Sequence, residues 1–284
     1  MWDEYASRSG RPRPTSRASR RRKHDARVGV PLIALALVLI IGILGAYAIL
    51  VPDRVEIDDA TGCRLSGPSA VTAILFDRTD PINDKQKLFL QNKLDTFQTT
   101  IQKYEEVDTY SLEDQGDHIV SPVKRLCDPG KGTDVSSLTG NPRLLHDRWE
   151  RKFDTPLREM MEKMREGGGA KTSAIFEEIQ SVSLQSFQNT KVSSNTPKRL
   201  ILISDLIQFT KTLDFYKGDL NYQPFQQSNE ARRLRTNLAG VSVEVFFIPR
   251  ARPDRINRLV EFWKNWMLDQ GARPDSFKVV WVEG

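Results

Sequence analysis

The sequence predicts an α/β fold, a doubly wound and mostly parallel sheet flanked by helices, preceded by one transmembrane helix. From Val71 to the end of the chain, short apolar runs alternate with amphipathic stretches. One of these runs, "RLILISDLIQF" (199–209), is almost continuously apolar, which is typical of a strand buried on both faces of a parallel sheet. With 284 residues, the chain is long enough to build a sizeable core.

The first element is a basic tail, residues 1–27. It contains nine Lys and Arg residues against three Asp and Glu residues, a net charge of +6, so the rest of the chain carries about −1 of the total of +5. Because the tail is rich in Arg, Ser and Pro and cannot bury a core, we expect it to be disordered. The remaining chain lacks the basic field of a nucleic-acid-binding protein, so we expect no nucleic-acid partner.

The second element, residues 28–52, has no charged residue. An α-helix needs about 20 apolar residues to cross a bilayer, and this segment supplies them. The alternative is a cleaved signal peptide, because Ala46-Tyr47-Ala48 has the small-x-small pattern of a cleavage site. Signal peptides have shorter apolar cores of about 7 to 15 residues, so we predict an uncleaved anchor that contacts the lipid bilayer.

Charge next to the span predicts its orientation. Basic residues crowd its N-terminal side between Arg20 and Arg27, whereas only Arg54 lies close to the other side. By the positive-inside rule, the N-terminus is cytoplasmic and residues 53–284 are exported. In a bacterium this is a single-pass inner-membrane protein with a periplasmic C-terminal domain.

Residues 53–70 read as a short linker, and the two cysteines follow the span. Because Cys63 and Cys127 both lie on the exported side, we predict a disulfide that ties the linker to the domain. Two unrelated thiols are the alternative. The cysteines with His118 and His146 lack the spacing of a metal site.

Residues 71–284 read as one domain whose elements follow from apolar periodicity. In the first helix, for example, Leu90, Leu94, Phe97 and Ile101 recur at helical spacing. In chain order we predict strand 71–76, helix 84–104, strands 107–112 and 118–126, helices 142–165 and 173–187, strand 199–209, helix 228–238, strand 241–249, helix 254–270 and strand 277–283.

Two of the predicted strands end in acids, Asp77 and Asp205. In open α/β sheets ligands bind at the carboxyl ends of the strands, so neighbouring strands would bring these acids together. Hydroxyl groups of Thr79, and of Thr172 or Ser173, could join them. Such an oxygen set suits Mg²⁺ or another hard divalent cation. Each acid could instead cap a helix or accept a hydrogen bond from a loop amide.

The order of these elements resembles the von Willebrand factor type A domain, whose metal site uses Asp-x-Ser-x-Ser after the first strand, a loop Thr and a later Asp. The first part reads Asp77-Arg78-Thr79-Asp80-Pro81, with Pro81 in place of the second Ser. The resemblance implies a metal held by Asp77, Thr79, Thr172 and Asp205, with Asp80 and Ser173 as weaker candidates. It also implies a partner protein whose acidic side chain completes the coordination. The segments "CDPG", "NPRLLHDRWERKF" and "LISDLIQ" are similar to uncharacterised, membrane-anchored bacterial proteins with such a domain.

Motifs for catalysis are missing. The sequence has no Gly-x-Ser-x-Gly elbow, and "DPGKGTD" lacks the strand and helix context of a P-loop. Few histidines are available for acid–base chemistry. We therefore expect a binding or scaffold module rather than an enzyme. The alternatives are a metal-dependent hydrolase that uses the same acids and a metal-free structural component of an envelope complex.

Overall fold

The computed structural model describes residues 17–50, 55–58, 60–112, 119–135, 140–165 and 171–283, with the backbone alone at 17–28, 48–50 and 164–165. The chain forms two compact units, Met1–Val55 and Glu56–Gly284.

The first unit contains one long helix, α1 (Arg17–Leu50). Its stretch Gly29–Tyr47 is long and apolar enough to cross a membrane, a property that membrane anchors share with signal sequences. The disorder predicted for residues 1–27 is wrong from Arg17 onward, because the helix begins there. Helix propagation costs little once a nucleus exists, and Ala and Arg are good helix formers, so the apolar helix extends into the basic segment.

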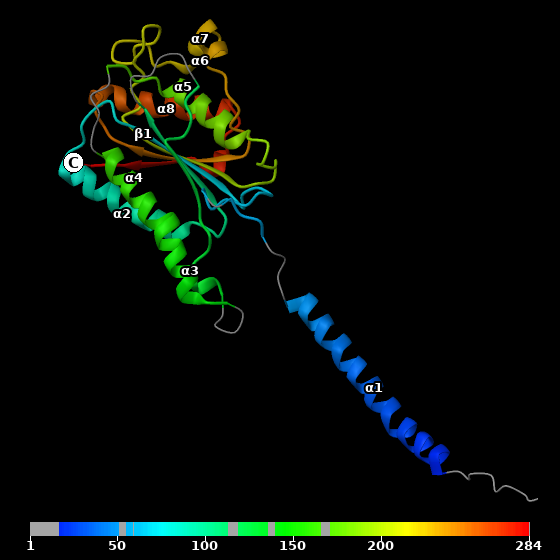
Figure 1. Cartoon of the computed structure of the whole chain (residues 1–284). Helices are drawn as coiled ribbons and strands as arrows, with labels where there is room; N and C mark the ends of the chain where they lie inside the picture. Colours follow the sequence, from blue (N-terminus) through cyan, green and yellow to red (C-terminus); the bar gives the residue numbers. More distant parts are fainter. Residues whose placement is uncertain are drawn as a thin grey trace, which may run out of the picture. The chain divides into compact units, whose positions relative to one another are not determined.

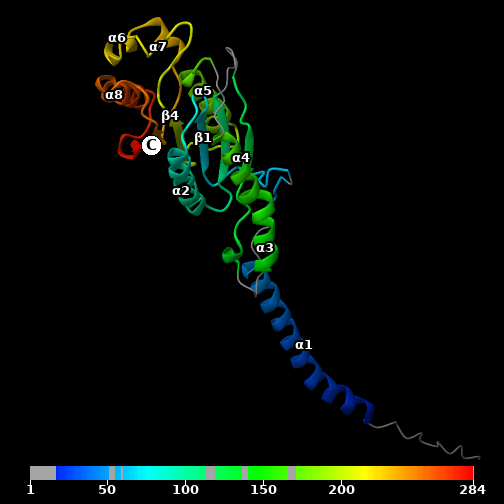
Figure 2. The same cartoon turned by 90° about the vertical axis from the view of Figure 1, so that its left-hand side faces the viewer.

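The second unit is the α/β domain of Figures 1 and 2. Its strands are β1 (Val71–Asp77), β2 (Glu106–Leu112), β3 (Lys124–Cys127), β4 (Lys198–Ser204), β5 (Val241–Phe247) and β6 (Lys278–Trp281). Its helices are α2 (Asp84–Thr100), α3 (Pro142–Trp149), α4 (Thr155–Arg165), α5 (Ile175–Val182), α6 (Tyr222–Gln226), α7 (Asn229–Arg233) and α8 (Pro253–Asp269). Two π-helical turns, η2 (Glu150–Asp154) and η3 (Ser183–Phe187), and two 3₁₀ turns, η1 (Gly132–Asp134) and η4 (Pro274–Ser276), complete the described elements.

The strands form one six-stranded sheet in the order β3-β2-β1-β4-β5-β6. All neighbouring strands are parallel except β2 and β3, which are antiparallel. The chain therefore winds outward from β1 in both directions, and β1 and β4 lie side by side in the centre. This arrangement confirms the predicted fold class.

Helices cover both faces of this sheet (Figures 1 and 2). Along β1, Ile74 and Phe76 pack with apolar residues of α2 and α4, whereas Ala73 and Leu75 pack with those of α5 and α8. Both sets of side chains are buried because successive residues of a strand point to opposite faces. This is why the central strands read as continuous apolar runs.

Several predicted elements are shorter in the structure; the strand predicted at 199–209, for example, ends at Ser204, so Asp205 lies in the loop after β4. Two of these differences have a local cause. The strand predicted at 118–126 begins only at Lys124, because Pro122 has no N–H for the ladder; residue 118 lies outside the described residues. The helix predicted at 228–238 is reduced to α7. The side-chain amide of Gln180 donates hydrogen bonds to the carbonyl groups of Arg233 and Arg235. These bonds replace the ones that the two carbonyl groups would accept in a longer helix.

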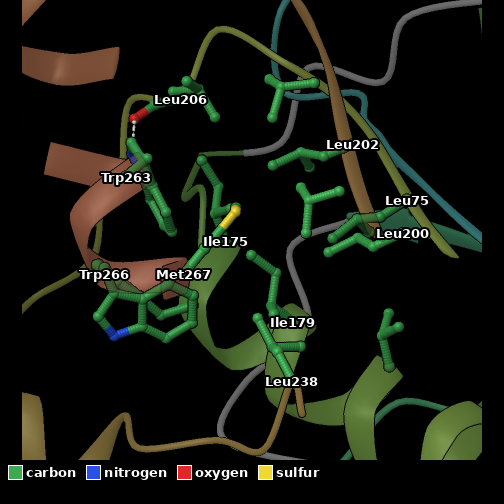
Figure 3. Close-up of a cluster of buried hydrophobic side chains, with 14 of the residues drawn as sticks. Leu75, Ile175, Ile179, Leu200, Leu202, Leu206, Leu238, Trp263, Trp266 and Met267 are labelled. Carbon is green, nitrogen blue, oxygen red and sulfur yellow. Dashed lines mark hydrogen bonds between the residues drawn. The ribbon is translucent and has the colours of Figure 1, made fainter. Parts of the chain in front are cut away.

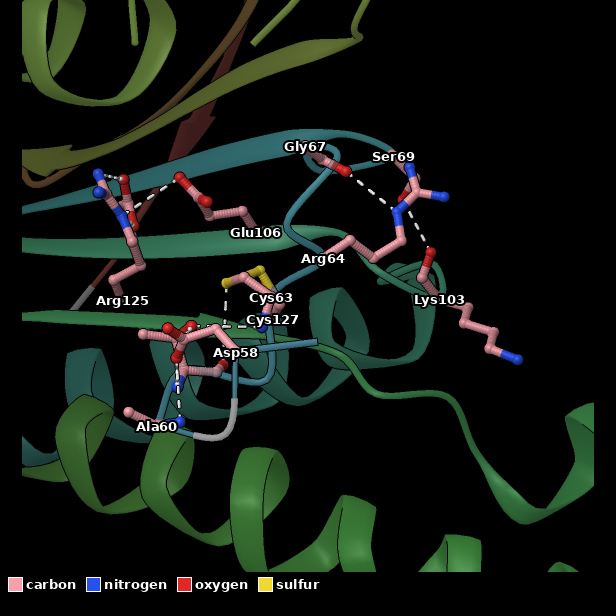
Figure 4. The surroundings of a disulfide bond; sticks show 12 residues. Asp58, Ala60, Cys63, Arg64, Gly67, Ser69, Lys103, Glu106, Arg125 and Cys127 are labelled. Carbon is pink, nitrogen blue, oxygen red and sulfur yellow. Dashed lines mark hydrogen bonds and ion pairs between the residues drawn. A yellow bond between two sulfur atoms is a disulfide. The ribbon is translucent and has the colours of Figure 1, made fainter. Parts of the chain in front are cut away.

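The predicted disulfide between Cys63 and Cys127 is present, and it joins the start of the domain to β3 (Figure 4). Disulfides persist in oxidising compartments. An N-terminal apolar helix, anchor or signal, together with this bridge indicates a domain outside the cytoplasm.

Candidate functional site

The candidate site is built around Asp77, the last residue of β1. Its carboxylate is buried and accepts hydrogen bonds on both oxygens. The hydroxyl and amide of Thr79 donate to Oδ1 at 2.7 and 3.1 Å. The hydroxyl groups of Ser204 and Ser173 donate to Oδ2 at 2.8 and 3.3 Å. Three chain segments therefore converge on one carboxylate.

The register of the central strands explains why Ser204 reaches Asp77. Phe76 on β1 pairs with Ile203 on β4, so the next residue of each strand lies at the same carboxyl edge of the sheet. Ser204 is buried, and its oxygen also accepts the amide of Leu206 at 2.8 Å. The end of β4 is thus tied to Asp77 by a side chain and to its own loop by the same hydroxyl.

Asp205 follows Ser204 and is also buried. Its Oδ1 accepts the amide of Ile207 at 2.8 Å, so part of its charge is stabilised by the loop. Burial, reinforced by the negative charges of Asp77 and Asp80, raises the pKa of Asp205 to about 8. Without an ion, the Asp205 carboxyl group is therefore mostly protonated at neutral pH, and a cation bound beside Asp77 would displace that proton.

The loop after Asp205 has a strained backbone. Leu206 lies in the left-handed region at φ 62°, where a non-glycine residue is costly. The indole N–H of Trp263, on α8, donates to the Leu206 carbonyl at 2.7 Å (Figure 3). The Leu206 side chain is buried in the same apolar cluster. Packing and one hydrogen bond therefore hold the strained residue next to Asp205.

Asp80, Arg250 and two aromatic residues surround these acids. The Arg250 Nε lies 3.9 Å from a carboxylate oxygen of Asp80, and the guanidinium also donates to the carbonyl of Pro81. Phe209 forms a β-bridge with Ser173 through backbone hydrogen bonds. The centres of the Phe209 and Tyr216 rings lie 5.6 Å apart. Burial first, and then the negative charges of Asp205, Asp80 and Asp77, raise the pKa of Tyr216.

The structure brings Asp77, Thr79 and Ser173 into direct contact, and Asp205 lies at the same sheet edge. Thr172 precedes Ser173 and is half-buried. Sequence reasoning missed Ser204. Its position directly before Asp205 was visible, but its role depends on the β1–β4 register, which the sequence does not provide.

These groups offer oxygen ligands only, namely two carboxylates and three hydroxyl groups. Such ligands fit a hard divalent cation, because hydroxyl groups can turn their lone pairs toward an ion. Among the described residues, one set of three acidic, His or Cys side chains lies close enough to share an ion: Cys63, Glu106 and Cys127. In that set the sulfurs are joined to each other and are not free to bind an ion. Around Asp77, no such set of three is found among the described residues, so a cation there would depend on the hydroxyl groups as well as on the acids.

Fold and site together define an α/β protein with a mostly parallel sheet and an acidic, hydroxyl-rich carboxyl edge. Comparison with known proteins adds no family: the chain matches no protein-family model, and no curated protein matches it.

Proposed function

We propose that this chain is a membrane-anchored binding module of the von Willebrand factor type A kind. Its domain would recognise a partner protein through a divalent cation at the carboxyl edge of the sheet. One observation carries the proposal: Asp77 ends β1 and Asp205 directly follows the adjacent strand β4, with three hydroxyl groups gathered on Asp77. A carboxylate pair with hydroxyl groups at this edge is a natural site for Mg²⁺.

We assign the ligands as Asp77, Thr79, Ser173 and Asp205. Ser173 is placed ahead of Thr172 because its hydroxyl contacts Asp77, while Thr172 remains the alternative. Ser204 adds a hydroxyl group that the family motif does not include. Asp80 carries an ion pair with Arg250 and is the weaker acidic candidate. An acidic side chain of the partner would complete the coordination.

Anchoring and location belong to the same proposal. The apolar segment 28–52 would remain as an inner-membrane anchor of a bacterial cell, with the basic tail in the cytoplasm and the domain in the periplasm. The apolar stretch Gly29–Tyr47 and the disulfide support this location. Confinement at the membrane suits a module that recruits or organises other proteins. We propose no catalytic role.

A metal-free structural role is the second candidate, and one observation favours it. Both carboxylate oxygens of Asp77 already accept hydrogen bonds from protein groups, which fasten β1 to β4 without an ion. In that case the acids would hold the sheet edge together, and the partner would bind elsewhere.

Titration of the purified full chain in detergent micelles with Mg²⁺ and Mn²⁺, followed by calorimetry, separates the two roles. Asp77→Asn and Asp205→Asn keep the shape of each side chain and remove its charge, so we expect metal affinity to fall at least about tenfold. Asp95→Asn, an exposed acid on α2, is the matched control and should bind as the wild type does.

Absence of binding at millimolar Mg²⁺ and Mn²⁺ would contradict the metal site and favour the structural role. The same conclusion would follow if all three variants bound metal equally well. A melting temperature measured with and without metal distinguishes a lost site from a misfolded variant, because only a folded, competent protein is stabilised by its ligand.

A further inference from the structure

The second compact unit begins with a segment that few packing contacts hold in place. The described residues of 55–66 are all half-buried or exposed, and burial begins at Gly67. The segment folds back on itself through an isolated bridge between Ile57 and Arg64. Hydrophobic burial therefore contributes little to its attachment.

Among the described residues, the contacts of this segment with the rest of the domain, apart from hydrogen bonds between Arg64 and its near neighbour Gly67, are a disulfide, a backbone hydrogen bond and a cation–π contact. The Cys63–Cys127 disulfide is the covalent one (Figure 4). The amide of Cys127 donates to the carbonyl of Thr61 at 3.0 Å, and the Arg64 guanidinium lies 5.0 Å from the centre of the Tyr104 ring. A backbone hydrogen bond and an exposed cation–π contact are each worth about 1 kcal/mol or less. The disulfide is the dominant restraint.

The two cysteine residues differ in exposure. Cys127, on β3, is 1% exposed, whereas Cys63 is half-buried, so an external thiol can approach Cys63 first. Glu106 pairs with Cys127 across β2 and β3, and its carboxyl oxygen and the two sulfurs lie within 4.8 Å of one another. Figure 4 shows Glu106 and Arg125 beside the bridge.

Glu106 is poorly paired for a buried acid. The Arg125 Nε lies 3.2 Å from Glu106 Oε1, but this oxygen accepts no hydrogen bond, because Arg125 directs its N–H groups to Asp108. Burial first, and then the charge of Asp108, raises the pKa of Glu106 to about 7; the positive charges of Arg125 and Lys191 oppose this rise. A large fraction of Glu106 is therefore protonated near neutral pH.

We propose that the Cys63–Cys127 disulfide is a redox-labile latch that a dithiol reductant opens, releasing residues 56–66 from the edge of the sheet while the rest of the domain stays folded. Glu106 acts on this exchange as the proton donor to Cys127.

Opening of the latch is a thiol–disulfide exchange in two steps. A thiolate of the reductant attacks the Cys63 sulfur, the Cys63–Cys127 bond breaks, and its electron pair stays on the Cys127 sulfur. That sulfur takes the proton of the Glu106 carboxyl group. The second thiolate of the reductant then displaces Cys63 from the mixed disulfide, so the protein gains two electrons and the reductant leaves as a disulfide.

For the anchored chain, an open latch lengthens the tether between membrane and domain. With the latch closed, five residues (51–55) separate the end of α1 from the compact domain; with it open, residues 56–66 join them. Eleven added residues extend the maximum reach by about 40 Å. This consequence rests on the proposed anchoring, but the latch itself does not depend on the anchor or on a metal.

Limited trypsin digestion of the full chain, with and without a dithiol reductant, tests the latch. The Arg64–Leu65 bond lies in the segment, and the Lys198–Arg199 region lies in central strand β4. We expect reduction to speed cleavage after Arg64 at least about tenfold and to leave the β4 sites uncut. A Cys63→Ser, Cys127→Ser double variant should be cut after Arg64 at the fast rate with or without reductant.

Two results would overturn the latch. One is equal protection of Arg64 in the oxidised, reduced and double-variant proteins. The other is cleavage within β4 on reduction, with loss of the far-UV circular dichroism signal, since the bridge would then hold the whole fold. Neither result bears on metal binding, which the calorimetric titration tests independently.

The role of Glu106 has its own measurement. The rate of disulfide reduction is measured for the wild type and for Glu106→Gln at each pH. Dividing one rate by the other removes the pH dependence that both share, because both react with the same thiolate of the reductant. We expect this ratio to be about ten below pH 7 and to fall toward one above it, because only the protonated acid can donate. A ratio of one at every pH would remove Glu106 from the exchange.

Discussion

A buried carboxylate survives in a protein only if its charge is stabilised, and Asp77 shows how neighbouring strands do this. Hydroxyl groups from its own turn, from the loop before α5 and from the end of β4 all point to it. Hydrogen bonds to charged groups are stronger than neutral ones, at about 1.5 to 3 kcal/mol. Ser204 contributes most to the geometry, because it also accepts the amide of Leu206.

Replacing Ser204 by Ala should therefore destabilise the domain. Both a donor to Asp77 and an acceptor for Leu206 are lost in a buried place, so we expect a loss of about 2 to 3 kcal/mol in the free energy of unfolding. Urea unfolding in the presence of a chelator measures it without a contribution from metal. Ser242→Ala, half-buried on β5, should change the stability by less than about 1 kcal/mol. Equal effects of the two variants would contradict this account.

The left-handed Leu206 gives a second prediction at this scale. Trp263→Phe keeps an aromatic ring in the cluster but leaves the Leu206 carbonyl without its donor. Trp266→Phe, in the same buried cluster, removes similar volume without touching that bond. We expect Trp263→Phe to cost about 1 to 2 kcal/mol more than Trp266→Phe in thermal or urea unfolding. A larger loss in Trp266→Phe would show that volume, not the hydrogen bond, matters here.

At the scale of elements, the edge formed by β2 and β3 concentrates charge. Arg125 on β3 donates to both carboxylate oxygens of Asp108 on β2 at 2.8 Å, and Ser186 donates to the same acid at 2.5 Å. Asp108 is therefore fully paired, whereas Glu106, two residues earlier on the same face, is not. At this edge the carboxylate form of Asp108 is stabilised by Arg125, whereas the neutral, protonated form of Glu106 is favoured.

This difference predicts a pH dependence of stability. The pKa of Glu106 is about 7 in the folded protein against 4.5 for the free side chain. The contribution of Glu106 to stability is therefore fully present below pH 4.5 and is lost as the pH rises through 7. Glu106→Gln is neutral throughout and cannot lose it. Between pH 5 and 8, we expect wild type to lose on the order of 2 kcal/mol more than the variant in urea unfolding. Parallel pH profiles of the two proteins would show that Arg125 compensates the charge of Glu106.

Elements were predictable where burial dictates the pattern. The apolar runs of β1, β4 and β5 and the periodicity of α2 and α8 are visible in the sequence, because each follows from the face that is buried. The π-helical turns η2 and η3 were not, since they continue the helical direction and change the periodicity over only five residues. The end of α7 and the turn after it depend on distant side chains, since Gln180 binds the Arg233 carbonyl and Gln270 accepts from the Thr236 amide, and no local pattern reveals these contacts.

For the candidate site, the prediction reached the acids but not the supporting hydroxyl. Asp77 follows the predicted strand 71–76 directly, so strand prediction alone locates it. Asp205 lies inside the predicted strand 199–209, and only the structure shows that β4 ends before it, at Ser204. Ser204 needs the register between strands that are 127 residues apart in sequence. The ion pair of Asp80 with Arg250 likewise joins two loops whose proximity only the sheet order explains.

At the scale of the whole molecule, the two units differ in where their apolar side chains are buried. The side chains of Gly29–Tyr47 are apolar and unburied within their own unit, so they require a lipid environment or removal. The domain instead has a closed core on each face of its sheet. A chain that keeps both parts would be held at a membrane surface by its first unit.

Whether the first unit is kept is a prediction at this scale. We expect the mature protein to retain it and to remain in the membrane fraction after washing with carbonate, because its apolar segment is longer than a signal-peptide core. Intact mass spectrometry of the purified protein checks this directly. A mature N-terminus near Ile49, together with recovery in the soluble fraction, would instead identify residues 1–48 as a cleaved signal.

The short interval between α1 and Glu56 has a consequence for how an anchored domain would meet its partners. If the anchor is kept, the five residues 51–55 reach at most about 18 Å, so residue 56 stays within that distance of the end of α1. A tether this short gives an effective concentration on the order of millimolar toward another membrane-bound protein, so even weak contacts become occupied. Partners that diffuse freely gain nothing from this confinement. A short tether thus favours binding partners in the same membrane, because they are confined to the same surface and not because they bind more tightly.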